Sequence, residues 1–170
     1  EAGDSPAVVF IQDFHFGLLP RIIKERNPHL IVAQFWHIPW PNPEVFRALP
    51  WKEELLEGLV GNDMIGFQLR HDCQNFLDTV DWTFEARVDR ERFEVTRNGK
   101  ATTVRPFPIS IDFAEYGATA ASAECLEGGK RWKRELGLGD CLVGVGVDRI
   151  DYTKGLLERL GAVDRLLTKY

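Results

Sequence analysis

The sequence LIVAQFWHIPWPNPEVFRALPWKEELLEGLVGNDMIGF, residues 30–67, contains two apolar strands with helices between them. The first run, residues 30–35, is typical of a strand buried within a parallel sheet, and residues 64–67 form the second. Between them lie a proline-rich loop at residues 36–43 and predicted helices at residues 44–49 and 51–59. A strand, helices and a further strand in this order predict a parallel α/β architecture.

The alternation of strands and helices continues on both sides of this segment. We expect a strand at residues 8–11 and a helix at residues 18–26 before it, and a helix at residues 71–80 after it. Asn98-Gly99 then predicts a type I′ hairpin between strands at residues 93–97 and 101–105. The rest of the chain predicts, in order, a loop or helix at residues 115–123, a helix at 124–136, a strand at 142–147 and a final helix from Leu156.

A domain boundary is predicted near residues 112–115, because a new helix–strand–helix unit begins after it. We therefore divide the chain into residues 1–112 and 113–170. The sequence has no initiator methionine, begins with EAGDSP, which lacks the regions of a signal peptide, and ends within a helical pattern. These features lead us to expect a fragment of a longer protein.

The composition narrows the classes of function. The net charge is -5 and no block of Lys or Arg interrupts it, so we expect no nucleic-acid partner. No apolar run approaches the ~20 residues of a membrane span, so we expect no membrane partner. The three cysteines, Cys73, Cys125 and Cys141, are far apart and form no C-x-x-C pair. This spacing argues against a zinc site or a disulfide framework and favours a cytoplasmic location.

Two cations follow the predicted strand at residues 142–147, in the sequence GVGVDRIDYTKG. Arg149 and Lys154 lie between the carboxyl end of that strand and the start of a helix, where α/β folds bind ligands. Arginine offers a planar fork and lysine a point charge, so the pair is suited to a diphosphate. An ordinary solvated turn is the alternative. Gly144 and Gly146 lie within the strand, so close packing of a helix explains them better than a dinucleotide fingerprint.

Two polar residues follow the first two predicted strands. Asp13 lies just past residues 8–11 and is placed either to accept hydrogen bonds from sugar hydroxyls or to cap the next helix. His37 follows the second strand, among Phe35, Trp36, Ile38 and Trp40, as in a sugar pocket with aromatic walls. A structural corner of proline and tryptophan is the alternative for that loop. His15 is expected to be a hydrogen-bonded core histidine rather than a metal ligand.

Five motifs together carry a resemblance to a known family. QDFHFGLLP, FWHIPWPNPEVFRALPW, EELLEGLVGNDMIGF, FPISID and GVDRIDYTKG resemble the trehalose-6-phosphate synthase family of retaining glycosyltransferases, and the match covers nearly all of residues 8–170. The resemblance implies the GT-B fold, an α/β fold with two facing Rossmann-like domains and parallel sheets, of which only part of each is present. Residues 1–112 would be the later part of the acceptor-side domain, and residues 113–170 the start of the nucleotide-sugar side.

The resemblance also implies roles for single residues. Arg149 and Lys154 match the pair that holds the donor diphosphate, and Asp13 matches an aspartate that contacts the acceptor. His37 matches a histidine next to the donor sugar, with Ile38 following it in the pocket wall. Asp13, His37, Arg149 and Lys154 are therefore the expected catalytic residues. The family transfers its sugar without a metal and without a cofactor, with UDP-glucose as donor substrate.

The implied reaction moves glucose with retention from UDP-glucose to glucose 6-phosphate and gives trehalose 6-phosphate. The implied partners are a nucleotide sugar and a sugar phosphate, and a homo-oligomer is left open for the full-length protein. Gln12, Phe14, Trp36 and Trp40 depart from the family pattern and are more like relatives such as glucosylglycerol-phosphate synthases, which would use glycerol 3-phosphate. A non-catalytic regulatory homologue is the other alternative. The isolated 170 residues are expected to be inactive.

Overall fold

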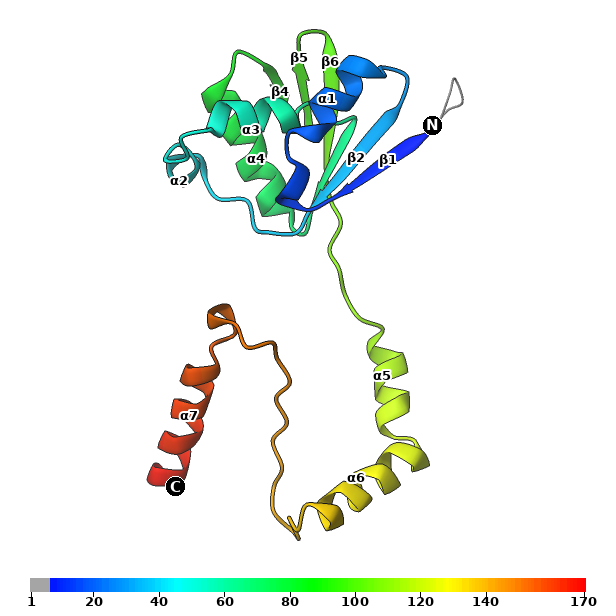
Figure 1. Ribbon diagram of the computed structural model, residues 1–170, viewed down its shortest axis with the longest axis vertical. Coiled ribbons are helices and arrows are strands. Elements are labelled where there is room, and N and C mark those ends of the chain that lie inside the picture. The colour runs from blue at the N-terminus through cyan, green and yellow to red at the C-terminus, as the bar shows by residue number, and fades with distance from the viewer. Residues whose placement is uncertain (1–6) are drawn as a thin grey trace. The chain divides into compact units, whose positions relative to one another are not determined.

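The computed structural model describes residues 7–170 of the chain. The chain divides into two compact units, Glu1–Ile111 and Asp112–Tyr170 (Figure 1). The first unit holds a sheet with helices packed on it. The second unit contains helices joined by extended segments.

The first unit is built on a six-stranded mixed sheet in the order β1-β2-β3-β6-β5-β4. Strands β1, β2, β3 and β6 run parallel to one another, whereas β5 pairs antiparallel with β6 and with β4. The sheet is thus parallel on one side and antiparallel at the other edge. The strands are β1 Val8–Gln12, β2 Ile31–Trp36, β3 Met64–Phe67, β4 Arg87–Asp89, β5 Glu94–Arg97 and β6 Lys100–Pro106.

The predicted hairpin is present between β5 and β6. Its turn residues Asn98 and Gly99 have φ of 51° and 75°, the positive values that a type I′ turn requires. Strand β4 was not predicted from the sequence. It has only three residues and none of them is fully buried, so it carries no apolar alternation.

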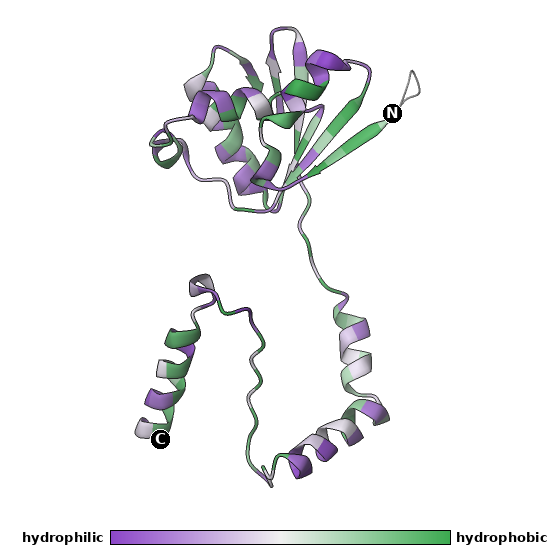
Figure 2. Cartoon of the chain, viewed as in Figure 1, coloured by the Kyte–Doolittle hydropathy of each residue, from purple (hydrophilic) through white to green (hydrophobic). Residues whose placement is uncertain are grey.

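Helices cover one face of this sheet and form the core with it. They are the short 3₁₀ helix η1 Phe14–Phe16 and the α-helices α1 Leu19–Arg26, α2 Pro43–Phe46, α3 Lys52–Leu59 and α4 Arg70–Thr83. Ile65 and Val104 of the sheet pack with Leu59 of α3 and Phe76 of α4, all fully buried. The opposite face carries exposed apolar side chains, and Figure 2 shows β1 and β2 as largely hydrophobic strands.

The second unit consists of α5 Phe113–Ala120, α6 Ala123–Glu135, a 3₁₀ turn η2 Tyr152–Lys154 and α7 Leu156–Lys169. Side-chain caps begin the first two helices: Asp112 accepts from Glu115 N–H at 3.0 Å, and Ser122 accepts from Cys125 N–H at 3.2 Å. Gly137, with φ of 64°, follows the end of α6.

The predicted strand at residues 142–147 is not formed, and this corrects the sequence analysis. Leu142 is fully exposed and Val147 is 89% exposed, and the segment pairs with no strand among residues 7–170. A parallel strand is stabilised only by hydrogen bonds to its neighbours, so an apolar run without a neighbour stays extended and solvated. The close-packing explanation for its glycines also fails at Gly144, which has open space around it, while Gly146 meets only the flexible end of Arg159.

None of the described helices is long and apolar enough to cross a membrane.

Candidate functional site

Asp13 and His37 meet at the carboxyl edge of the parallel strands. The register pairs Gln12 with Phe35, so the residues that leave β1 and β2 emerge side by side. The backbone N–H of His37 donates a hydrogen bond to Asp13 Oδ1 at 3.1 Å. The carboxyl edge of a parallel sheet is where α/β folds bind ligands, so these two residues form the centre of the candidate site.

The backbone of Asp13 has an unusual conformation, with φ of 60° and ψ of -164°. Glycine reaches this region freely, but other residues reach it only under constraint from their surroundings. Asp13 N–H donates to Phe35 O at 2.7 Å, and the Gln34 side-chain amide donates to Asp13 O at 2.9 Å. The interpretation of Asp13 as a side-chain helix cap is wrong, because its carboxylate makes no capping bond to η1. The carboxylate is instead directed to the His37 backbone.

The His37 ring is held on two sides and is exposed on the others. Its Nε2 lies 2.9 Å from Gln12 Oε1, and its ring stands edge-on to Phe35 with 4.6 Å between centroids. No residue of the described chain binds Nδ1. The ring is therefore oriented by the protein and still accessible to a ligand.

The aromatic wall predicted around His37 is only partly present. Phe35 contacts the ring and Ile38 is exposed next to it, but Trp36 and Trp40 are buried in the core. Trp40 stacks on Phe46 and donates from its indole to the Thr79 hydroxyl at 3.1 Å. Because successive residues of a strand point to opposite faces, Trp36 turns into the core where Phe35 and His37 turn away from it. The structural-corner interpretation therefore holds for the two tryptophans.

Arg149 and Lys154 lie in the second unit, on either side of a fixed carboxylate. Asp151 accepts from the backbone N–H and from the hydroxyl of Thr153, both at 2.9 Å. These bonds, the backbone one first, lower the pKa of Asp151, and the charges of Arg149 and Lys154 lower it further. Both cations are exposed, and they share Asp151 as a nearby counter-charge.

Two local features shape the turn that holds these cations. Gly155 has φ of 58° between η2 and α7, a left-handed conformation that glycine adopts without strain. Asp148 accepts a short bond from the Arg159 guanidinium of α7 at 2.6 Å. The sequence analysis missed this ion pair. Asp148 lies in an irregular segment before α7, so no helical spacing pattern links it to Arg159 in the sequence.

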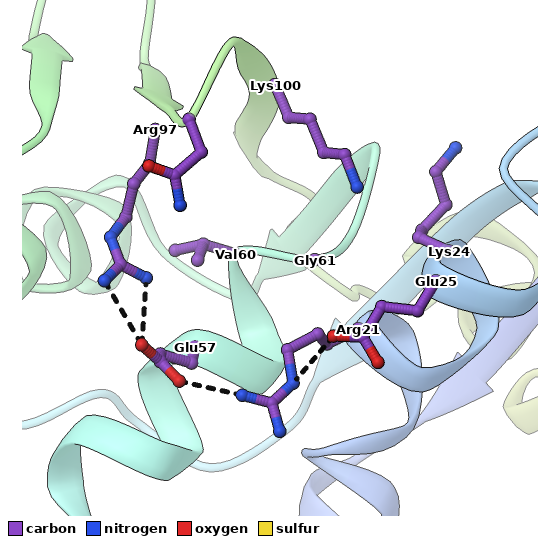
Figure 3. Close-up of a pocket in the computed structure, with 9 residues that line it drawn as sticks. Arg21, Lys24, Glu25, Glu57, Val60, Gly61, Arg97 and Lys100 are labelled. Atoms are coloured by element: carbon purple, nitrogen blue, oxygen red, sulfur yellow. Dashed lines mark hydrogen bonds and ion pairs between the residues drawn. The ribbon is translucent and has the colours of Figure 1, made fainter.

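The first unit also has a charged hollow, lined by residues that include Arg21, Glu57 and Arg97, which does not belong to the candidate site (Figure 3). Most of its charged side chains form ion pairs: Glu57 accepts from Arg21 at 2.7 Å and from Arg97 at 3.2 Å, and Lys24 pairs with Asp63 at 2.9 Å. Asp63 directly precedes β3, so this hollow lies at the amino ends of the strands, away from the edge where α/β folds bind ligands. We interpret it as an ion-pair cluster that ties α1, α3 and the hairpin together.

The chain was compared with known families and proteins. The model of glycosyltransferase family 20 matches residues 2–170. The trehalose-6-phosphate synthase of Mycobacterium sp. (strain JLS) is 39% identical over 168 residues, 95% of this chain and 35% of that protein. The trehalose-6-phosphate synthase of Mycobacterium avium (strain 104) is 37% identical over 170 residues, 96% of this chain and 34% of that protein. The chain thus spans about a third of the length of these relatives.

Solved structures agree with this match. The N-terminal domain of the Candida albicans trehalose-6-phosphate phosphatase superposes with a TM-score of 0.79 at 28% identity, covering 96% of this chain and 34% of that chain. The UDP-forming α,α-trehalose-phosphate synthase of Burkholderia xenovorans gives 0.75 at 28% identity, covering 95% and 35%. An E. coli trehalose-6-phosphate structure bound with UDP-2-fluoro glucose gives 0.75 at 33% identity, covering 96% and 35%.

These similarities confirm the α/β fold of GT-B type that was predicted from the sequence. The match of the family model to nearly the whole chain, together with relatives near 39% identity, is decisive for the family. The chain belongs to glycosyltransferase family 20.

Proposed function

We propose that the full-length protein containing this chain transfers glucose with retention from UDP-glucose to glucose 6-phosphate, giving trehalose 6-phosphate. The observation that carries the proposal is the Asp13–His37 pair at the carboxyl edge of a family 20 sheet. It is supported by the relatives near 39% identity, which are named trehalose-6-phosphate synthases. The first unit would then belong to the acceptor side of the enzyme and the second unit to the nucleotide-sugar side.

Asp13 would bind the acceptor sugar and hold its reacting hydroxyl in place. One carboxylate oxygen, Oδ1, accepts from His37 N–H, and no residue of the described chain binds the other. A free carboxylate oxygen on a rigid strand end is a strong acceptor for sugar hydroxyls, and fixed orientation of the acceptor supplies proximity to the reaction. His37 would contact the donor sugar beside it, with Ile38 in the wall of that pocket.

Arg149 and Lys154 would stabilise the departing diphosphate. Cleavage of the anomeric bond builds positive charge on the sugar and negative charge on the leaving group. Two cations beside that group lower the barrier by stabilising charge that develops in the transition state. In this proposal they replace the metal ion that other transferases use, and transfer proceeds on one face of the sugar without a cofactor or a protein nucleophile.

A second candidate is a non-catalytic relative that binds a nucleotide sugar without transferring it. The observation behind it is the altered acceptor loop, in which Gln12 and Phe14 flank Asp13. Calorimetry with UDP and turnover assays separate the two: binding of UDP without transfer to any acceptor would favour the non-catalytic function.

The test of the proposed function is a UDP-release screen of the full-length protein with UDP-glucose. Glucose 6-phosphate, glycerol 3-phosphate and fructose 6-phosphate are supplied in turn as acceptors. We expect release with glucose 6-phosphate and an α,α-linked product by NMR. Release with glycerol 3-phosphate alone would instead identify a glucosylglycerol-phosphate synthase, and release with none of them would refute the transfer.

We further propose a cytoplasmic location, supported by the thiols of Cys73, Cys125 and Cys141, which are all free. Sedimentation of the full-length protein would show whether it forms a homo-oligomer.

A further inference from the structure

Asp13 is held in a backbone conformation that it would not adopt by itself. With φ of 60° and ψ of -164°, it occupies a region that is essentially restricted to glycine. Such a residue persists only when surrounding contacts over-determine its position. Contacts from neighbouring residues must therefore hold Asp13 in this conformation.

One of these contacts comes from a glutamine buried in the core. Gln34 is 1% exposed within β2, and its side-chain nitrogen donates to the backbone oxygen of Asp13 at 2.9 Å. A buried amide costs free energy unless its donors and acceptors are paired. The position is otherwise typical of an apolar core residue, since Val32 on the same face of the strand is completely buried.

A second buried amide fixes the direction of the first. Asn62 is 2% exposed, and its side-chain nitrogen donates to Leu59 O at 2.9 Å and to Gln34 Oε1 at 3.0 Å. A backbone carbonyl only accepts, so Leu59 fixes the nitrogen of Asn62, and that nitrogen in turn fixes the oxygen of Gln34. The nitrogen of Gln34 is then left to face Asp13 O, the carbonyl at the other end.

The hydrogen-bonded side chains of Gln34 and Asn62 form a relay that leaves one buried acceptor unpaired. The Thr102 hydroxyl of β6 lies 2.7 Å from Val60 O and 2.9 Å from the backbone O of Asn62, so these two carbonyls share its one proton. The side-chain oxygen Asn62 Oδ1 is buried without a hydrogen-bond partner in the described chain. An apolar residue at Gln34 would remove the need for these amides. The carbonyl of Asp13, which Gln34 binds, accounts for the presence of these amides in the core.

We propose that Gln34, oriented by Asn62, is a positioning residue that holds Asp13 in its strained conformation and so directs the Asp13 carboxylate into the site. The inference rests on the proposed function in one respect, because the acceptor-binding role of Asp13 is itself proposed. The relay as a structural device stands on its own geometry.

The kinetic test uses the full-length protein with Gln34→Met, which keeps the length of the side chain and removes its hydrogen bonds. We expect the KM for glucose 6-phosphate to rise about 10- to 100-fold, by analogy with the loss of residues that orient metal ligands. The KM for UDP-glucose should be unchanged. The matched control is Thr102→Val, which removes a buried hydrogen bond of the same network away from Asp13. It should lower Tm without changing the acceptor KM.

The stability test does not depend on activity. Asp13→Gly and Asp13→Ala both lack the carboxylate, so the Tm advantage of the glycine variant over the alanine variant measures the strain at this position. With Gln34 present, the Tm of Asp13→Gly should lie well above the Tm of Asp13→Ala. When Gln34→Met is added, the backbone can relax and the advantage should shrink.

An equal advantage in both backgrounds would overturn the proposal, as would an unchanged acceptor KM in Gln34→Met when Asp13→Ala itself raises that KM. If Asp13→Ala leaves acceptor kinetics unchanged, the proposed role of Asp13 fails instead. The comparison of Tm values still decides whether Gln34 holds the strain.

Discussion

The backbone N–H of His37 donates to the carboxylate of Asp13 at 3.1 Å, across 24 residues of sequence. The bond joins the ends of two neighbouring parallel strands. It uses one oxygen of Asp13 and leaves the other without a partner in the described chain. The two polar residues that the sequence placed after its first two strands therefore act as one unit.

Asp13→Ala in the full-length protein is expected to lower kcat/KM for the acceptor about 10- to 100-fold, because a hydrogen bond to a charged group contributes about 1.5–3 kcal/mol. The kcat/KM of Asp13→Asn for the acceptor should lie between those of wild type and Asp13→Ala, since the amide oxygen of asparagine can still accept from His37. Steady-state kinetics with glucose 6-phosphate and with UDP-glucose measure the effect.

The control for that experiment is Glu85→Ala, which removes an exposed carboxylate from the loop after α4. It should change neither substrate's kinetics. Acceptor kinetics that stay at wild-type level in Asp13→Ala would remove Asp13 from the site.

The strain at Asp13 leads to a prediction for stability. Asp13→Gly should be more stable than Asp13→Ala by about 1–3 kcal/mol, the usual cost of such a conformation for a residue with a side chain. Both variants lose the bond from His37, so that loss cancels in the comparison. Denaturant unfolding of the two proteins measures the difference, and an alanine variant that is equally stable would show that position 13 carries no strain.

The strands of the parallel half of the sheet could be predicted because their signal is local. Residues 30–35 and 64–67 are apolar runs bounded by polar turns, and β2 and β3 form within one residue of them at each end. The hairpin could be predicted equally well, because Asn98-Gly99 has a conformational preference that needs no tertiary contact.

The rest depends on contacts between residues distant in sequence. Nothing in the sequence near Asp13 indicates its positive φ. That conformation is set by Gln34 and Phe35 of the next strand and by His37, which follows it. The apolar run at residues 142–147 failed as a predicted strand for the same reason, since a strand exists only with a neighbour. The opposite directions of Trp36 and His37 could have been predicted from the alternation of side chains along a strand. The prediction required the strand to extend beyond residue 35.

Cys73 makes the stability of the protein depend on alkaline pH. Burial, and then the charge of Asp72, raise the pKa of its thiol from about 9 to about 11. Between these values the unfolded thiol loses its proton while the folded one keeps it, so the free energy of unfolding falls as pH rises above 9. Cys73→Ala should show a shallower fall between pH 9 and pH 11 in denaturant unfolding.

The exposed thiol at Cys125 provides the control for this slope. Cys125→Ala should retain the wild-type dependence on pH, because it leaves the buried thiol of Cys73 in place. A slope that is the same in Cys73→Ala and in wild type would contradict the prediction.

Chelation tests the proposed replacement of a metal by protein cations. Because Arg149 and Lys154 would stabilise the leaving diphosphate, excess EDTA should leave the rate of UDP release unchanged in the full-length protein. A loss of activity in EDTA that Mg²⁺ or Mn²⁺ restores would show that a metal shares this task.

Substitution of the two cations is the direct test of their role. Arg149→Ala and Lys154→Ala should each lower kcat about 10²- to 10³-fold, as loss of one donor to a developing anion does in other enzymes. Arg149→Lys should recover only part of the loss, because lysine restores the charge without the planar fork that binds two oxygens. Calorimetry with UDP should show weaker binding in all three variants.

Arg165→Ala, on the exposed surface of α7, removes a cation of the same unit outside the turn and should behave as wild type. This control separates a specific diphosphate contact from a general loss of positive charge. If Arg149→Ala bound UDP and turned over like Arg165→Ala, the turn around Asp151 would be an ordinary solvated turn, and the diphosphate contact would have to come from elsewhere in the full-length protein.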